Sequence, residues 1–168
     1  MGYGLVEIKN NKPFLICAGV VQLDHYKEQS IKLKMITVKL QALIREHQPN
    51  EMSVEAPFYG VNPQSMLKLG RAQGAAMVAG AIEGLVVCEY SPKKVKQSIT
   101  GNGNASKEQV AAMLKQLLKI DKLPKFLDCT DALGLAMTHF YQMGRPTGNK
   151  SYTGWKAFVK ANPSKIKK

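Results

Sequence analysis

The stretch EMSVEAP, residues 51–57, alternates apolar side chains at positions 52, 54 and 56 with polar ones at 53 and 55. This period of two predicts a strand that ends at Pro57, because proline cannot donate a ladder hydrogen bond. A helix rich in small residues is expected over 63–84, and a further strand over 85–90. A strand, a helix and a strand in succession predict an α/β domain.

The flanking sequence extends this pattern in both directions. Apolar runs at 3–8 and 13–23 predict two strands joined by a hairpin turn at KNNK, residues 9–12, since asparagine tolerates the positive φ of such turns. Helical spacing of apolar residues predicts helices over 30–48, 107–119 and 127–143, and 92–99 is expected to be a basic helix or loop. Ser106 and Gln109 fit a capping box. The expected fold is a mixed sheet flanked by helices.

The helix expected over 63–84 contains Gly70, Gly74 and Gly80. Each interior glycine costs a helix about 1 kcal/mol relative to alanine. Such glycines are usually explained by close approach of the helix to a sheet or to a partner helix, and both remain open here.

Composition restricts the partner more than the reaction. The 168 residues include 24 Lys and Arg against 12 Asp and Glu, a net charge of +12. This excess favours a polyanion, either nucleic acid or an anionic membrane surface. The three cysteines are odd in number and lack zinc or redox spacing, so buried free thiols in a reducing compartment are expected. With no signal peptide and no stretch long enough to span a bilayer, the expected location is the cytoplasm.

Carboxylates in apolar surroundings are the candidate catalytic and metal-binding groups. Glu55 lies near the end of the strand expected over 51–57. Asp128 and Asp131 lie three residues apart at the start of the last helix, where both project from one face. A solvated strand end would explain Glu55, and helix capping would explain the two aspartates. Clustered carboxylates in a basic protein also suit Mg²⁺ or Mn²⁺, and two such ions could drive phosphodiester hydrolysis.

Three blocks of sequence carry a family resemblance. They are EAPF (55–58) followed by SMLKLGRAQG (65–74), then KQSITGNGNASKEQV (96–110), and then DCTDALGLA (128–136) followed by Thr138 and His139. In this order and spacing they resemble the RuvC-type Holliday-junction resolvases, and the likeness extends from Gly2 to about Met143. The resemblance implies a bacterial, ribonuclease H-like nuclease that acts as a homodimer on four-way DNA junctions. Such enzymes make paired symmetric nicks.

The resemblance also assigns roles to residues. Four acidic residues hold two Mg²⁺ ions per site in the family, with Mn²⁺ as a substitute, and Glu55, Asp128 and Asp131 match the second, third and fourth. Lys96 and Lys107 match basic residues near the scissile phosphate. Phe58 matches an aromatic residue that stacks on an unpaired base, and Tyr59 shares its loop. A branch-migration complex is a partner implied by the family alone.

One departure from the family concerns the first acidic ligand. In the family it follows an apolar first strand, in the middle of the sheet, just before a Gly-Tyr-Gly; here Met1 directly precedes Gly2-Tyr3-Gly4. A truncated record or misplaced start is the expected explanation, and Glu7 is a poor substitute by position. The alternative is a catalytically incompetent protein that binds junction DNA. A basic RNA-binding protein would also fit the composition, but it leaves the three blocks unexplained.

The remaining expectations concern domain limits and smaller motifs. Residues 1–144 are expected to form the nuclease domain and 145–168 a basic, loosely ordered tail. The turn at 101–104 is expected to bring backbone amides near a DNA phosphate, beside Lys107. His139 is expected to be structural rather than catalytic.

Overall fold

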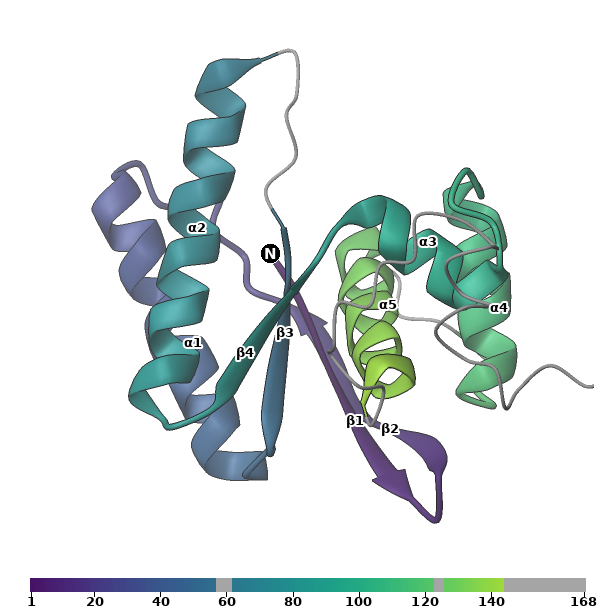
Figure 1. Cartoon of the computed structure of the whole chain (residues 1–168). Coiled ribbons are helices and arrows are strands. Elements are labelled where there is room, and N and C mark those ends of the chain that lie inside the picture. Colours follow the sequence, from purple (N-terminus) through teal and green to yellow (C-terminus); the bar gives the residue numbers. More distant parts are fainter. Residues whose placement is uncertain (57–61, 123–125, 144–168) are drawn as a thin grey trace, which may run out of the picture.

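The computed structural model describes residues 1–56, 62–122 and 126–143, so the tail expected at 145–168 lies outside the described part. The chain begins with a hairpin and a long helix, continues through a strand–helix–strand unit, and then forms the helices that complete the described part (Figure 1). The elements are β1 (Gly2–Lys9), β2 (Lys12–Val20), α1 (Gln29–His47), β3 (Glu51–Glu55), α2 (Pro63–Ile82), β4 (Val86–Tyr90), α3 (Pro92–Thr100), α4 (Lys107–Leu117) and α5 (Leu127–Gln142). The α/β class is confirmed, and the expected segments agree within about three residues at their ends.

Local sequence signals account for the turns and caps. Asn10 and Asn11 both have positive φ, 51° and 59°, as a two-residue hairpin turn between β1 and β2 requires. Ser106 accepts a hydrogen bond from the Gln109 amide, and the Gln109 side chain accepts one from the Ser106 amide. The capping box at the start of α4 is therefore confirmed.

The strands form two separate ladders. β1 pairs with β2 antiparallel, and β3 pairs with β4 parallel, with Glu55 opposite Tyr90 and Ser53 opposite Cys88. Among the described residues, no backbone ladder joins these two pairs. One pair is antiparallel and the other is parallel, so together they contain the two kinds of pairing found in a mixed sheet.

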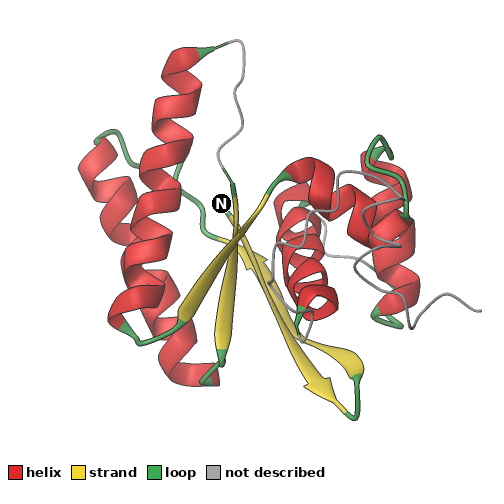
Figure 2. Cartoon of the chain, in the orientation of Figure 1, coloured by secondary structure: helices red, strands yellow, loops and turns green. Residues whose placement is uncertain are grey.

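Helix α5 bridges the two ladders, because it contacts all four strands. Figure 2 shows α1 and α2 beside β3 and β4 on one side, with α3 and α4 beyond α5 on the other. The packing of α5 on β1 is very close. A Cβ at Gly2 would lie 2.0 Å from the Asp128 carbonyl oxygen, and one at Gly4 would lie 2.7 Å from Leu133 Cδ2. Glycines at these two positions thus set how near the acidic start of α5 comes to β1.

Two hydrophobic clusters form the core, one on each side of the strands. The cluster between the β3–β4 pair and the helices α1 and α2 is built on Ile36, Leu40, Val54, Ala76 and Ala79. The cluster under α3, α4 and α5 is built on Ile99, Ala105, Val110, Leu114, Leu118, Leu133 and Met137. Each cluster anchors one side of the surface on which the candidate site lies.

The glycines of α2 have different explanations. A Cβ at Gly80 would lie 2.8 Å from Met52 Sδ and 3.1 Å from a Val87 methyl, so Gly80 permits close packing of α2 on the sheet. At Gly70 and Gly74 a Cβ would meet nothing within 4 Å. The sheet therefore explains Gly80 alone.

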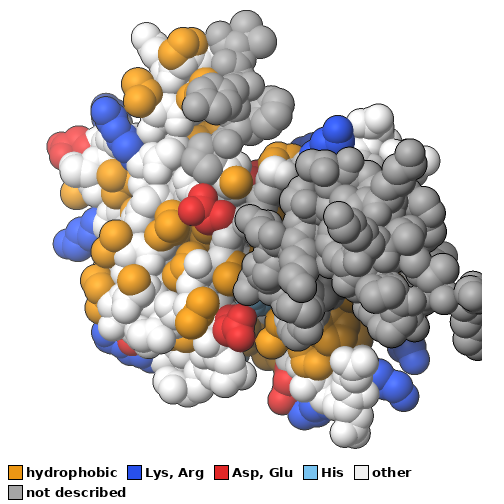
Figure 3. Space-filling model, viewed as in Figure 1, with side chains coloured by type: hydrophobic (Ala, Val, Ile, Leu, Met, Phe, Trp, Pro, Cys, Tyr) orange, Lys and Arg blue, Asp and Glu red, His pale blue; other side chains and the backbone are white. Residues whose placement is uncertain are grey.

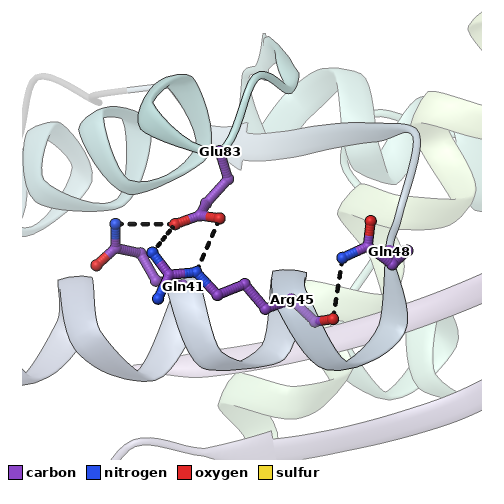
Figure 4. Close-up of polar contacts among 4 residues, drawn as sticks. All are labelled: Gln41, Arg45, Gln48 and Glu83. Atoms are coloured by element: carbon purple, nitrogen blue, oxygen red, sulfur yellow. Dashed lines mark hydrogen bonds and ion pairs between the residues drawn. The ribbon is translucent and has the colours of Figure 1, made fainter.

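A polar clamp joins α1 to α2 (Figure 4). Arg45 donates from Nε to Glu83 Oε2 at 3.0 Å and from Nη2 to Oε1 at 2.6 Å, and Gln41 donates to Oε1 at 3.0 Å. Gln48, which caps α1, donates back to the Arg45 carbonyl at 2.9 Å.

In the parts of the chain that the structure describes, no helix combines the length and apolarity needed to cross a bilayer.

Candidate functional site

Glu55 is the last residue of β3, the strand in which apolar and polar side chains alternate. Glu55 is exposed to solvent. Even so, its pKa is raised, first because neighbouring protein atoms displace water, and second because the negative charge of Asp131 repels it. Lys107 partly offsets this effect. The raised pKa shows that Glu55 and Asp131, which are far apart in sequence, share one electrostatic environment.

Asp128 and Asp131 lie in the first two turns of α5, and both are more than half exposed. A side-chain capping hydrogen bond does not account for them, because the N-cap is Phe126 and no side chain makes such a bond there. Asp128 does lie in the first turn, where the helix dipole favours a negative charge. Asp131 Oδ2 lies 3.5 Å from Lys107 Nζ, and Asp128 Oδ2 lies 3.5 Å from the Met1 ammonium nitrogen. Both carboxylates therefore stand at the surface beside cationic nitrogens.

The structure brings the predicted acidic residues to one region without closing them into a tight cluster. In the described part of the chain, Glu55, Asp128 and Asp131 do not form a group whose ligand atoms all lie within 4.8 Å of one another. Their chemistry nevertheless fits a hard divalent cation, because all offer carboxylate oxygens. The repulsion between Glu55 and Asp131 is also of the kind that a bound cation relieves.

Basic side chains lie on the elements beside these carboxylates. Lys107 is the first residue of α4, and Lys96 lies in α3; both helices pack on α5. On the face shown in Figure 3, some acidic side chains lie toward the middle among apolar ones and others lie near the outline, where the Lys and Arg side chains also lie. The aromatic residues singled out by the sequence, Phe58 and Tyr59, fall outside the described residues.

The turn after α3 does not offer its amides to a ligand. Gly101 donates to the Gln97 carbonyl, Asn102 to Thr100 Oγ1, Gly103 to Gln97 Oε1, and Asn104 to the Asn102 side chain. The expectation that these amides approach a phosphate is therefore wrong for this conformation. Gln97 and Thr100 at the end of α3, together with the Asn102 side chain, already satisfy these donors, and a glycine-rich pattern does not reveal this.

Sequence reasoning missed a group at the other end of β3. His139 on α5 contacts Glu51, the first residue of β3, with 2.6 Å between Nε2 and Oε2, and it contacts the Tyr90 hydroxyl at 2.9 Å through Nδ1. These contacts agree with a structural role for His139. Glu51 and His139 are 88 residues apart, so no local spacing could have paired them.

The cysteines are free, as the sequence predicts. Only Cys129 is buried, whereas Cys17 and Cys88 are partly exposed, so the expectation of burial holds for one of the three. Cys88 lies in β4 beside the Glu51–His139 pair.

Comparisons with known proteins identify the family of this chain. The family model "Crossover junction endodeoxyribonuclease RuvC" matches residues 1–139. The proteins of that name from Christiangramia forsetii and Cytophaga hutchinsonii are 54% and 53% identical to this chain over 99% of its length. The matches cover 87% and 82% of those two proteins.

Two solved RuvC structures are similar to this chain. Thermus thermophilus RuvC in complex with Holliday junction substrate superposes with a TM-score of 0.78 at 32% identity, covering 83% of this chain and 86% of that one. A structure of Thermus thermophilus RuvC gives a TM-score of 0.76 at 30% identity, covering 83% and 87% of the two chains. The sequence blocks, the acidic ends of β3 and α5 and these matches lead to one conclusion: the chain belongs to the RuvC family of crossover junction endodeoxyribonucleases.

Proposed function

We propose that this protein is a structure-selective endodeoxyribonuclease that resolves Holliday junctions in DNA recombination and repair. It makes paired symmetric nicks by metal-dependent phosphodiester hydrolysis. The observation that carries the proposal is the coupling of Glu55 to Asp131, with Lys107 as the neighbouring cation. This arrangement offers oxygen ligands for a metal and a positive charge for a phosphate in one place.

Glu55, Asp128 and Asp131 would hold the metal, and Mg²⁺ is the ion proposed, two per site, with Mn²⁺ as a substitute. When bound, such ions activate water and stabilise the leaving oxygen. Lys107 would contact the phosphate through the ammonium that lies beside Asp131, because that group has three donors. The raised pKa of Glu55 means that acidification protonates this ligand earlier than an ordinary glutamate, so metal binding should weaken as pH falls.

DNA binding is proposed to combine charge with loop contacts. The net charge of +12 supplies attraction to phosphates, and Lys96 and Lys107 would contact the backbone near the cut. Phe58 and Tyr59 are proposed to stack on an unpaired base at the junction. A homodimer would place one site on each of two opposing strands, in the cytoplasm of a bacterium.

The test compares carboxylate variants on a labelled synthetic four-way junction with Mg²⁺. Glu55→Gln and Asp131→Asn are expected to abolish nicking while junction binding persists. Glu7→Gln is the matched control, because Glu7 lies on β1, is partly exposed and pairs with Lys9 at 2.8 Å. Full cutting by both site variants would refute the assignment, and so would loss of cutting in the Glu7 control.

A further inference from the structure

A second group of potential ligands lies away from the carboxylates of the proposed nuclease site. Ligand atoms of Glu51, Cys88 and His139 all lie within 4.8 Å of one another. Glu51 is four residues before Glu55 along β3, about 13 Å at strand rise. His139 is eight residues after Asp131 along α5, about 12 Å at helical rise. The two groups are therefore separate in space.

The strand register explains how this second group is assembled. Alternate residues of a strand share a face, so Glu51, Ser53 and Glu55 lie on one face of β3. Cys88 lies opposite Ser53 and Tyr90 opposite Glu55, which places both on the same face of the ladder. Helix α5 covers this face, because His139 contacts both Glu51 and Tyr90. Three elements thus each contribute one ligand.

The contacts of His139 prepare it for a cation. Its side chain is only 12% exposed, and Tyr90 Oη lies 2.9 Å from Nδ1. When Nδ1–H donates to Tyr90, the lone pair of Nε2 points toward Glu51 and Cys88. A hydrogen bond from the distal ring nitrogen is the feature that orients metal-bound histidines generally.

We infer that Glu51, Cys88 and His139 form a second cation site, which takes a zinc-class divalent ion and leaves a fourth position for water. An oxygen, a sulfur and a nitrogen ligand suit Zn²⁺ and similar transition metals, whereas Mg²⁺ avoids thiolates. Binding converts the Cys88 thiol to a thiolate and releases its proton to solvent. The neutral His139 ring binds the metal through Nε2 in the tautomer that carries its single proton on Nδ1, so the ring itself releases no proton.

Such an ion would tie α5 to β3 and β4. These strands belong to the ladder that no backbone hydrogen bond joins to β1–β2 within the described residues. Its proposed effect is to hold α5 against β3 and β4, and it does not rest on the proposed nuclease activity.

The test is a titration with Co²⁺, a spectroscopic substitute for Zn²⁺, in excess Mg²⁺ and a non-thiol reductant. The wild-type chain is expected to show a thiolate-to-cobalt charge-transfer band that saturates at one ion per chain. Cys88→Ser should abolish the band. Cys17→Ser is the matched control and should keep it, because the Cys17 sulfur also lies near a histidine, 3.7 Å from His47 Nε2. Absence of a band in the wild-type chain, its persistence in Cys88→Ser, or its loss in Cys17→Ser would overturn the inference.

Two further variants keep the inference testable if Cys88→Ser folds poorly. Glu51 is 35% exposed, so Glu51→Gln should fold and should weaken Co²⁺ binding at least tenfold. Tyr90→Phe removes the partner of Nδ1 and should weaken binding roughly tenfold or more with the band still present at saturation. Zn²⁺ alone should raise the melting temperature of the wild type and of Cys17→Ser more than that of Glu51→Gln. Unchanged affinity in Glu51→Gln would contradict the site.

Discussion

The close packing of β1 on α5 makes Gly4→Ala an informative perturbation. The added Cβ would lie 2.7 Å from Leu133 Cδ2, 3.1 Å from its Cγ and 3.4 Å from its backbone nitrogen. Comfortable carbon contacts begin near 3.5 Å, so the Leu133 methyl would have to move by about 0.8 Å. Leu133 is fully buried in the cluster under α3, α4 and α5, which leaves little room for that movement.

The expected magnitude follows from two opposing effects. Overpacking a filled core costs about 1–3 kcal/mol. Replacing glycine by alanine in a strand returns roughly 0.5–1 kcal/mol, because the unfolded chain loses freedom. The midpoints of these two ranges give a net destabilisation of about 1 kcal/mol. Gly74→Ala is the control: a Cβ there meets nothing within 4 Å, so the helix should gain about 1 kcal/mol.

Urea unfolding of the two variants measures this difference, and a double mutant identifies its cause. Leu133→Ala alone should cost about 2–5 kcal/mol. Gly4→Ala added to Leu133→Ala should cost nothing further, because the clashing methyl groups are gone. If Gly4→Ala alone is as stable as wild type, or if its cost persists in the Leu133→Ala background, the packing of β1 on α5 is not as described.

Three further predictions concern charges. The native pKa of Glu55 is raised, so the folded protein holds this proton more tightly than the unfolded chain does. This contribution to the free energy of unfolding is fully present below the unfolded-state pKa, and it is lost as the pH rises through the native pKa. Glu55→Gln should therefore unfold at higher urea than wild type at neutral pH without Mg²⁺, and the gap should close on acidification; a gap that widens would contradict this. The pKa of Glu83 is lowered by its hydrogen bonds with Arg45 (Figure 4), so the clamp stabilises above the unfolded-state pKa and is lost as pH falls through the native one. Glu83→Gln should lower the urea midpoint at neutral pH and match wild type at low pH, and equal midpoints at neutral pH would show that the clamp contributes nothing. Lys107→Gln should slow junction nicking roughly 100-fold, whereas Lys115→Gln in the last turn of the same helix should not, and equal rates would remove Lys107 from the site.

The sequence predicts most of this fold because its signals are local. Positive-φ asparagines, a capping box and apolar periodicity each act within a few residues. Ser106, Asn10 and Asn11 illustrate this, since each has the conformation or contact that its neighbours predict. The same reasoning finds Glu55, Asp128 and Asp131, because their positions at element ends are visible in the chain.

What the sequence could not predict depends on distance or on side-chain hydrogen bonds. Nothing local relates Glu51 to His139, and only the register of β3 and β4 brings Cys88 between them. The amides of the turn at 101–104 do not await a phosphate, because Thr100 and Gln97 accept the hydrogen bonds of Asn102 and Gly103. Composition does not show these contacts. The glycines of α2 look alike in sequence, yet only Gly80 is packed against the sheet.

To test whether the chain resolves junctions, cleavage is mapped on both pairs of opposing strands of a synthetic four-way junction, with Mg²⁺ and with the metal chelated. We expect nicks at symmetric positions on two opposing strands in Mg²⁺, leaving 5′-phosphate and ligatable ends. When the metal is chelated, the junction should be bound but uncut. A junction that is bound yet stays uncut in Mg²⁺ would contradict the proposed nuclease function and identify the chain as a junction-binding protein without nuclease activity.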